Sequence, residues 1–201
     1  MSSRDQILKS IRNQITASVE HPGLQGDWIR YEDRAKQFAE ALATVGGTAL
    51  VVDTAEEINA HLSQVPAYAE AKKLVSLCPS IDGNVDFAAI EDPHDLQDVD
   101  FALLPAKFAV AENGAVWVDD AAVKHRVIYF IPQHLALVVP APGDPAEAIV
   151  DNMHQAYQRL SLDGRGFGTF ISGPSKTADI EQSLVIGAHG ARSLHVFFLR
   201  Q

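Results

Sequence analysis

The chain has 201 residues, of which 47% are hydrophobic and 21% are charged, a balance typical of a folded globular protein and not of a disordered or fibrous one. Its 26 acidic residues against 16 Lys and Arg residues give a formal charge of -10, which argues against nucleic acid as a partner because phosphate contacts dominate such binding. No apolar stretch approaches the roughly 20 residues that a membrane span requires, and the first residues lack a signal-peptide pattern, so we expect a cytoplasmic protein.

The first 30 residues predict a helical arm followed by a linker. Ser3 and Gln6 form a capping-box pattern, and apolar residues then recur at helical spacing. These apolar residues are Ile7, Leu8, Ile11 and Ile15. A His-Pro-Gly sequence at 21–23 ends the helix, and a glycine-rich stretch runs to Gly26. We therefore predict one domain over residues 1–201, with 1–30 as its N-terminal helical arm and linker.

The next segment has a strand-helix-strand rhythm. A helix is predicted from Tyr31 to Val45, where Gly46 and Gly47 end it, and the apolar run 48–52 predicts a strand. Thr54 and Glu57 then cap another helix, which Pro66 closes. Residues 73–77 predict the following strand.

The middle of the chain has short apolar runs with little room for helices between them, which predicts a mixed, partly antiparallel sheet. These runs are 101–104, 108–110, 115–118 and 134–139. A helix is predicted from Asp144-Pro145 to about Leu160, and another at 178–186, with strands at 167–171 and 194–199. Together these elements predict an α/β fold: a three-layer domain with helices on both sides of a mostly parallel mixed sheet.

Cysteine and histidine usage argues against a cofactor bound by this chain alone. Cys78 is the single cysteine, which excludes an intrachain disulfide and a cluster held by four thiolates of this chain. It follows an apolar run and precedes a proline, so we expect a buried, inert thiol. The histidines show no zinc-site spacing, and no metal site is predicted.

A small-residue loop after the strand at 167–171 is the first candidate site. Where a strand passes through such a loop into a helix, free backbone N–H groups converge and suit a carboxylate or a phosphate. The candidate residues are Ser172, Gly173, Pro174, Ser175, Lys176, Thr177 and Asp179. Pro174 stands where a phosphate-binding loop has its lysine, which disfavours nucleotide hydrolysis. The alternative is a helix cap without a ligand.

Two further segments carry candidate residues. Glu112 precedes Asn113 and Gly114, a dipeptide that favours a β-hairpin turn, so Glu112 is either a solvated hairpin-end residue or a nucleophile, base or ligand-orienting carboxylate. In the second case Asn113 and Gly114 are ligand-binding candidates beside it. His189 is able to titrate near neutral pH, and Arg192 is able to hold a carboxylate with two hydrogen bonds. For these two, the alternative is a surface His and Arg after a glycine-ended helix.

The C-terminal sequence from Ile171 to Glu181, then Gly187 to Gly190 and Leu194 to Val196, resembles the signature of the LUD-domain family, specifically the lactate-utilisation protein C group. The opening segment 3–12 resembles that family's first helix, so the resemblance spans most of the chain. The sequence departs from the family pattern in four places. Lys176 stands where arginine is expected, Ala191 where proline is frequent, and Asn113 and Ala115 where many members have threonine.

The resemblance implies a fold similar to the NagB, RpiA and CoA-transferase superfamily and a bacterial source. It implies a non-redox subunit of a complex that oxidises lactate to pyruvate, whose sister subunits hold the iron–sulfur clusters, with a small carboxylate or phosphate-like molecule as a further ligand. Whether the chain is itself an enzyme stays open. A second reading is acyl transfer with Glu112 as nucleophile, because Ala111 to Gly114 resembles the catalytic glutamate motif of CoA transferases. A third is a scaffold or regulator without chemistry of its own.

Overall fold

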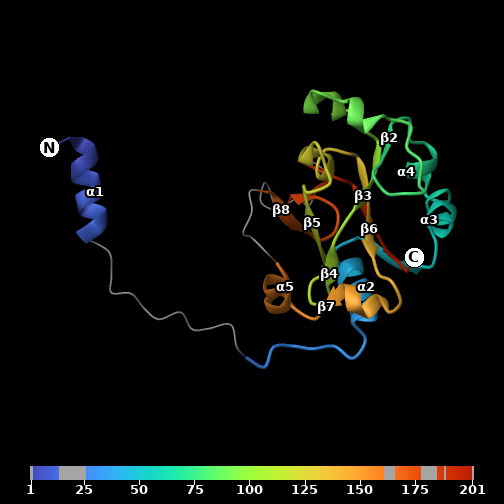
Figure 1. Cartoon of the computed structure of the whole chain (residues 1–201), viewed down its shortest axis with the longest axis horizontal. Coiled ribbons are helices and arrows are strands. Elements are labelled where there is room, and N and C mark those ends of the chain that lie inside the picture. Colours follow the sequence, from blue (N-terminus) through green and yellow to red (C-terminus); the bar gives the residue numbers. More distant parts are fainter. Residues whose placement is uncertain (1, 14–25, 161–165, 178–184, 188, 201) are drawn as a thin grey trace.

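A five-stranded parallel sheet forms the centre of the computed structural model, which describes residues 2–13, 26–160, 166–177, 185–187 and 189–200 (Figure 1). The strand order is β1-β11-β6-β3-β2, and every neighbouring pair is parallel. The strands are β1 (Thr48–Val52), β2 (Leu74–Ser76), β3 (Phe101–Pro105), β6 (His134–Pro140) and β11 (Ser193–Leu199). The inner strands β3, β6 and β11 are almost wholly apolar because both of their faces are covered.

Two helices cover one face of this sheet, α3 (Ala55–Leu62) and α4 (Pro66–Ala69). Ile58 and Leu62 of α3 pack in one cluster with Phe101 and Phe197 of the sheet. The predicted cap of α3 is confirmed, because the Glu57 N–H donates to Thr54 Oγ1 at 3.3 Å. Pro66 does not close α3, which ends at Leu62, but occupies the first turn of α4, where its missing N–H costs nothing.

Helix α2 (Arg34–Thr44) and a second sheet cover the opposite face. Phe38 of α2 is fully buried, with its ring edge-on to Phe198 of β11 at a centroid distance of 5.2 Å. The second sheet has the order β7-β4-β5-β8, and it packs Ala109, Val116 and Val118 into the same cluster as α2. Its strands are β4 (Phe108–Val110), β5 (Ala115–Asp119), β7 (Ile149–Val150) and β8 (Gly168–Ile171).

Helix α5 (Met153–Arg159) lies on the far face of the second sheet, where Ala156 joins a small cluster with Phe108 and Val110. The single helix predicted from 144 to about 160 is therefore wrong in its first half. Residues 145–148 form a 3-10 helix, and 149–150 form β7, which pairs with β4. The helix starts again only at Asn152, whose side chain accepts the Gln155 N–H at 3.0 Å.

The predicted α/β fold with a mostly parallel central sheet is confirmed. The antiparallel pairing expected in the middle of the chain lies in the second sheet, where β4 pairs with β5 and β5 with β8. The runs at 101–104 and 134–139 instead join the parallel sheet. One covering layer is thus partly β, with α2 and the second sheet side by side.

The helix predicted at 178–186 is wrong at its end. Val185–Ile186 form β10, which pairs antiparallel with β9 (Lys176–Thr177), and β-branched residues favour that extended conformation. Residues 178–184 lie outside the described part of the chain. The other short elements are the 3-10 helices η1 (Phe87–Ala89), η2 (Pro93–Leu96), η3 (Arg126–Tyr129) and η4 (Pro145–Ala148).

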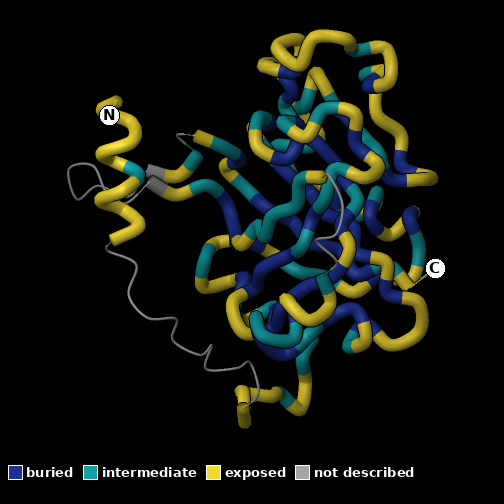
Figure 2. Tube along the Cα trace, turned by 60° about the vertical axis from the view of Figure 1, so that its left-hand side comes forward, coloured by how far each residue is buried: buried dark blue, intermediate teal, exposed yellow. Residues whose placement is uncertain are grey.

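The predicted N-terminal helix is present as α1 (Ser3–Asn13), and none of its residues is buried (Figure 2). Its capping box is shifted by one residue: Ser2 Oγ accepts the Asp5 N–H at 3.2 Å, and Asp5 Oδ2 accepts the Ser2 N–H at 3.1 Å. Ile7 and Ile11 are more than half exposed, so these two residues of the predicted apolar stripe face solvent. Within the described ranges, no helix has the length and apolar character to cross a membrane.

Candidate functional site

The hairpin predicted at Asn113 and Gly114 is confirmed. β4 and β5 pair antiparallel, and the turn between them closes with the Gly114 N–H donating to the Val110 carbonyl at 3.1 Å. Asn113 Oδ1 accepts the Ala115 N–H at 3.1 Å, which fixes the turn locally. Gly114 has a φ of +65° and packs against α2, where a Cβ atom would lie 2.7 Å from the Leu42 nitrogen. Glycine is therefore required by both the backbone conformation and the contact.

Glu112, the predicted catalytic residue, lies exposed in this turn and accepts a hydrogen bond from the chain. Its Oε2 accepts the N–H of Met153, the first residue of α5, at 2.9 Å. Its own N–H donates to the Asp151 carbonyl at 3.0 Å. The carboxylate thus satisfies one of the free N–H groups at the start of α5. Glu112 therefore has a structural role as an acceptor at the N-terminus of α5, and its catalytic role stays a prediction.

The loop at 172–175 is held at both ends. Ser172 Oγ donates to the Asn113 carbonyl at 2.8 Å, which joins the loop to the hairpin turn. Gly173, with a φ of +74°, lies against Val45 at the end of α2. The Ser175 N–H donates to the Ala191 carbonyl at 2.8 Å, and the Ser175 carbonyl accepts the Gly187 N–H at 2.9 Å. The first of these contacts places the loop beside the turn that contains Glu112.

Not all of the predicted anion-binding loop has the expected geometry. Pro174 is buried, and the Ser175 N–H already has a partner within the chain. Lys176 is exposed, but it and Thr177 form β9, so no helix begins within the described part of this loop. Asp179 lies outside the described residues. Anion binding at this loop remains a prediction.

His189 and Arg192 lie in the segment that precedes β11. His189 is exposed and lines a hollow of about 350 Å³ together with Phe130, Gln133 and two glycines. Arg192 is exposed too, but it is not among the residues that line this hollow; its backbone N–H donates to the Gln133 carbonyl at 2.8 Å. The structure therefore places His189 at a hollow and leaves Arg192 beside it.

The segments that line this hollow lie at the amino-terminal edge of the parallel sheet. Residues 187–192 directly precede β11, and the 127–133 segment directly precedes β6. Ligands of open parallel sheets usually bind at the carboxyl-terminal edge. The same rule gives no support to a catalytic role for Glu112. This residue follows β4, which belongs to the second, mixed sheet and not to the parallel one.

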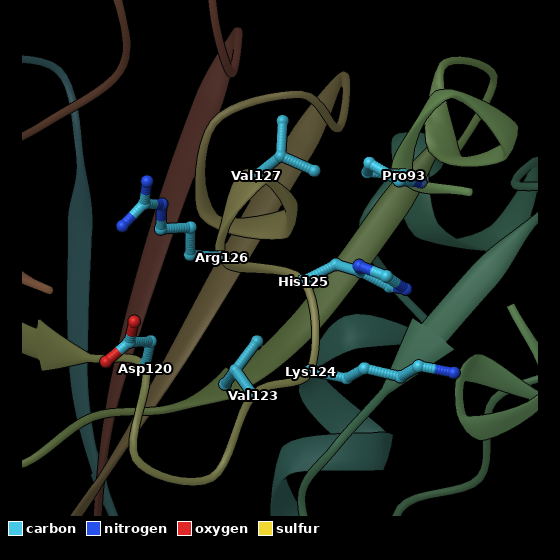
Figure 3. Close-up of a pocket in the computed structure, with 7 residues that line it drawn as sticks. All are labelled: Pro93, Asp120, Val123, Lys124, His125, Arg126 and Val127. Carbon is cyan, nitrogen blue, oxygen red and sulfur yellow. The ribbon is translucent and has the colours of Figure 1, made fainter. Parts of the chain in front are cut away.

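A second hollow, of about 390 Å³, lies in front of the 120–127 loop (Figure 3). It adjoins the first, since Val127 lines both. Its lining residues are Pro93, Asp120, Val123, Lys124, His125, Arg126 and Val127. Sequence reasoning missed this site. The run of Lys124, His125 and Arg126 between two strands is the signal that could have indicated it.

Side chains around the second hollow are held by several contacts. Lys124 Nζ forms an ion pair with Glu91 at 2.8 Å and donates to the Ala88 carbonyl at 3.1 Å. His125 Nε2 bonds the Ile90 carbonyl at 2.8 Å, so this nitrogen carries the proton and Nδ1 is left as an acceptor in the neutral ring.

Cys78 and His195 are buried titratable groups whose pKa values are strongly shifted. Burial raises the pKa of the Cys78 thiol to about 12, which agrees with the predicted inert thiol. Burial, and then the charges of His61 and His134, lower the pKa of His195 to about 4. Within the described residues, no group of three or more His, Cys, Asp or Glu side chains is arranged to hold a metal ion.

Comparison with known proteins gives a consistent family. A family model described as the LUD domain matches residues 67–199. Lactate utilization protein C of Shouchella clausii is 33% identical over 96 residues, which cover 45% of this chain and 40% of that protein. The protein of the same name from an Exiguobacterium species is 35% identical over 98 residues, with the same two shares. The chain thus spans about two fifths of the length of these relatives.

Two further matches cover more than four fifths of the chain. An uncharacterized protein of Neisseria meningitidis serogroup B is 24% identical over 221 residues, which cover 96% of this chain and 92% of that protein. The crystal structure of a DUF162 family protein from Deinococcus radiodurans aligns with a TM-score of 0.59 and 19% identity, covering 83% of this chain and 98% of that one. At that identity, the likeness to the solved structure shows the fold alone.

Proposed function

Because the chain belongs to the LUD-domain family, we propose that it is the non-redox subunit of a cytoplasmic, iron–sulfur-dependent complex that oxidises lactate to pyruvate. The observation that carries the proposal is the family match over residues 67–199, together with relatives named lactate utilization protein C. The acidic, cysteine-poor composition fits a subunit that works through binding and positioning.

The chemistry of Cys78 supports the division of labour in this proposal. An iron–sulfur cluster of the common kind needs four cysteine thiolates, and this chain has one cysteine. That thiol is 8% exposed and stays protonated at neutral pH, because its pKa is about 12. The residues present do not fit a cluster, so we assign the clusters, which carry electrons away from the substrate, to sister subunits.

This chain then contributes a substrate surface or a bridge between subunits. The two adjoining hollows at 120–131 and 187–190 are the surfaces that suit such a role, because they place imidazole and cationic groups at the protein surface. His125 and Arg126 line one of these hollows, and His189 lines the other.

Reconstitution with and without this chain tests the proposal. We expect the pure chain to be colourless and to give no lactate-dependent dye reduction. Sister subunits purified with the chain should reduce the dye, and sister subunits without it should lose most of that rate. As a matched control, Cys78→Ala in the full complex should keep the rate, because this buried thiol is not a cluster ligand.

Two results would overturn the proposed function. One is lactate turnover by the isolated chain. The other is an unchanged rate of lactate oxidation by the sister subunits in the absence of the chain.

A further inference from the structure

Phe167 holds two opposite charges at the hollow in front of the 120–127 loop. Its backbone N–H donates to Asp120 Oδ1 at 2.9 Å, and its carbonyl accepts the Asp120 N–H at 3.0 Å. Its ring lies under the guanidinium of Arg126, with Cζ 5.1 Å from the ring centroid. A single residue therefore orients both a carboxylate and a guanidinium, and stacking on an aromatic ring restricts the plane of the guanidinium.

Asp120 and Arg126 do not neutralise each other. Both line the same hollow, yet no ion pair joins these two described residues within 4.0 Å. Lys124 differs, since its ammonium is paired with Glu91 at 2.8 Å. In Figure 3, Asp120 and Arg126 lie on one side of the hollow, and Lys124 and His125 extend to the other. Among the described residues, neither the Arg126 guanidinium nor Asp120 Oδ2 has a hydrogen-bond or ion-pair partner.

We propose that this hollow binds a small 2-hydroxycarboxylate, with its carboxylate on Arg126 and its hydroxyl donating to Asp120. Arginine presents two parallel N–H donors that match a carboxylate, and an ionised aspartate accepts a hydrogen bond from a hydroxyl group. Val123 and Val127, between the charged groups, provide apolar contact for the rest of the ligand. The volume of about 390 Å³ lies within the usual range of small-molecule sites.

The choice of a hydroxyl group over an ammonium group rests on the proposed function, since Asp120 accepts hydrogen bonds from either. The arrangement itself requires only a carboxylate and a neighbouring donor on one small molecule. Propionate, which has the carboxylate without the donor, and alanine, which has an ammonium donor, are therefore the informative comparisons with lactate.

The test is a titration of the ¹⁵N-labelled full chain with lactate, propionate and alanine, followed through amide chemical shifts. Lactate should shift the amides of residues 120–127. Propionate should bind about tenfold more weakly than lactate, because a hydrogen bond to a charged group is lost. Arg126→Gln should weaken lactate binding about tenfold or more, and Asp120→Asn should reduce the preference for lactate over propionate.

Arg159→Gln is the matched control, because Arg159 also lies over an aromatic ring, that of Phe108 at 4.9 Å, and does not line the hollow. It should bind lactate as the unaltered chain does, and the spectra of all variants report whether the fold is kept. The proposal is overturned if lactate leaves 120–127 unshifted, if propionate binds as tightly as lactate, or if the two arginine variants behave alike.

Binding by the pure chain is measured without partners, so failure here and failure of the proposed function are distinguishable. Lactate binding at 120–127 without any effect of the chain on lactate oxidation would overturn the proposed function and support this site. Tighter binding of alanine than of lactate would overturn the hydroxy-acid assignment.

Discussion

The turn at 111–114 with the loop at 172–175, and the hollow at 120–127, use polar groups in different ways. In the turn and loop, Glu112, Asn113, Ser172 and Ser175 bond to backbone atoms of the chain itself. In the hollow, the guanidinium of Arg126 is oriented by a ring and is not ion-paired with Asp120. Motifs that are prominent in a sequence can reflect the requirements of turns, whereas unpaired charges at a hollow arise only when the chain is folded.

The largest expected effect on stability is at Gly114, where the hairpin turn packs directly against α2. Gly114→Ala should lower the free energy of unfolding by about 3 kcal/mol, because it combines a positive φ with a clash against the α2 backbone. Gly143→Ala is the control: it shares a positive φ of +80° but has no atom within 4 Å of the added methyl, and it should cost about 1 kcal/mol. Urea unfolding measures both, and equal losses would contradict the predicted clash with α2.

The next effect is the loss of stability in acid from His195. Its ring shares a hydrogen bond of 2.8 Å with Thr48 and is 9% exposed. Since the folded-state pKa is about 4 and the ordinary value is 6.5, the unfolded chain takes up the proton first as the pH falls, which favours unfolding. This ring alone should cost about 2 kcal/mol between pH 7 and pH 5 and about 1 kcal/mol more by pH 4, and the loss should level off below pH 4.

His195→Gln isolates that contribution, because an amide does not titrate over this range. The unfolding free energy of this variant should depend less on pH than that of the unaltered chain. His94→Gln is the control, since the His94 ring is exposed and bonds to Asp92 at the surface. An unchanged pH dependence in the His195 variant would show that this ring is not the source.

A smaller effect is expected at Glu112. Glu112→Gln should lower the free energy of unfolding by about 0.5 kcal/mol, because a carboxylate that accepts a helix N-terminal N–H is exchanged for a neutral amide. Glu147→Gln, at an exposed glutamate of η4, should change it less. Incubation with an acyl-CoA should add no mass to the Glu112 peptide. A thioester on Glu112, trapped by hydroxylamine, would instead support acyl transfer by this residue.

The sequence predicted the fold class because hydrophobic periodicity and capping residues act locally. Thr54 marks the start of α3, and the Asn113-Gly114 pair marks the hairpin. The failures are non-local. Ile149 joins β7 because β4 lies beside it, and Val185 joins β10 because β9 does, so tertiary pairing overrides the helical pattern. The run 124–126 is a local signal for the hollow, but the orientation of Asp120 and Arg126 was not predictable, since Phe167 is distant in sequence from the charges it orients.

The smallest expected effect on stability is at Arg126, which represents the hollow at 120–127 in the comparison with the turn and loop. Arg126 is exposed, so the stacking of its guanidinium on Phe167 contributes only about 0.5 kcal/mol, and Arg126→Gln should lower the free energy of unfolding by no more than that. Urea unfolding of this variant beside Gly114→Ala gives the contrast directly. A loss of about 2 kcal/mol or more would mean that the fold itself requires the guanidinium. A loss within about 0.5 kcal/mol, together with weakened lactate binding, separates a residue that binds from one that folds.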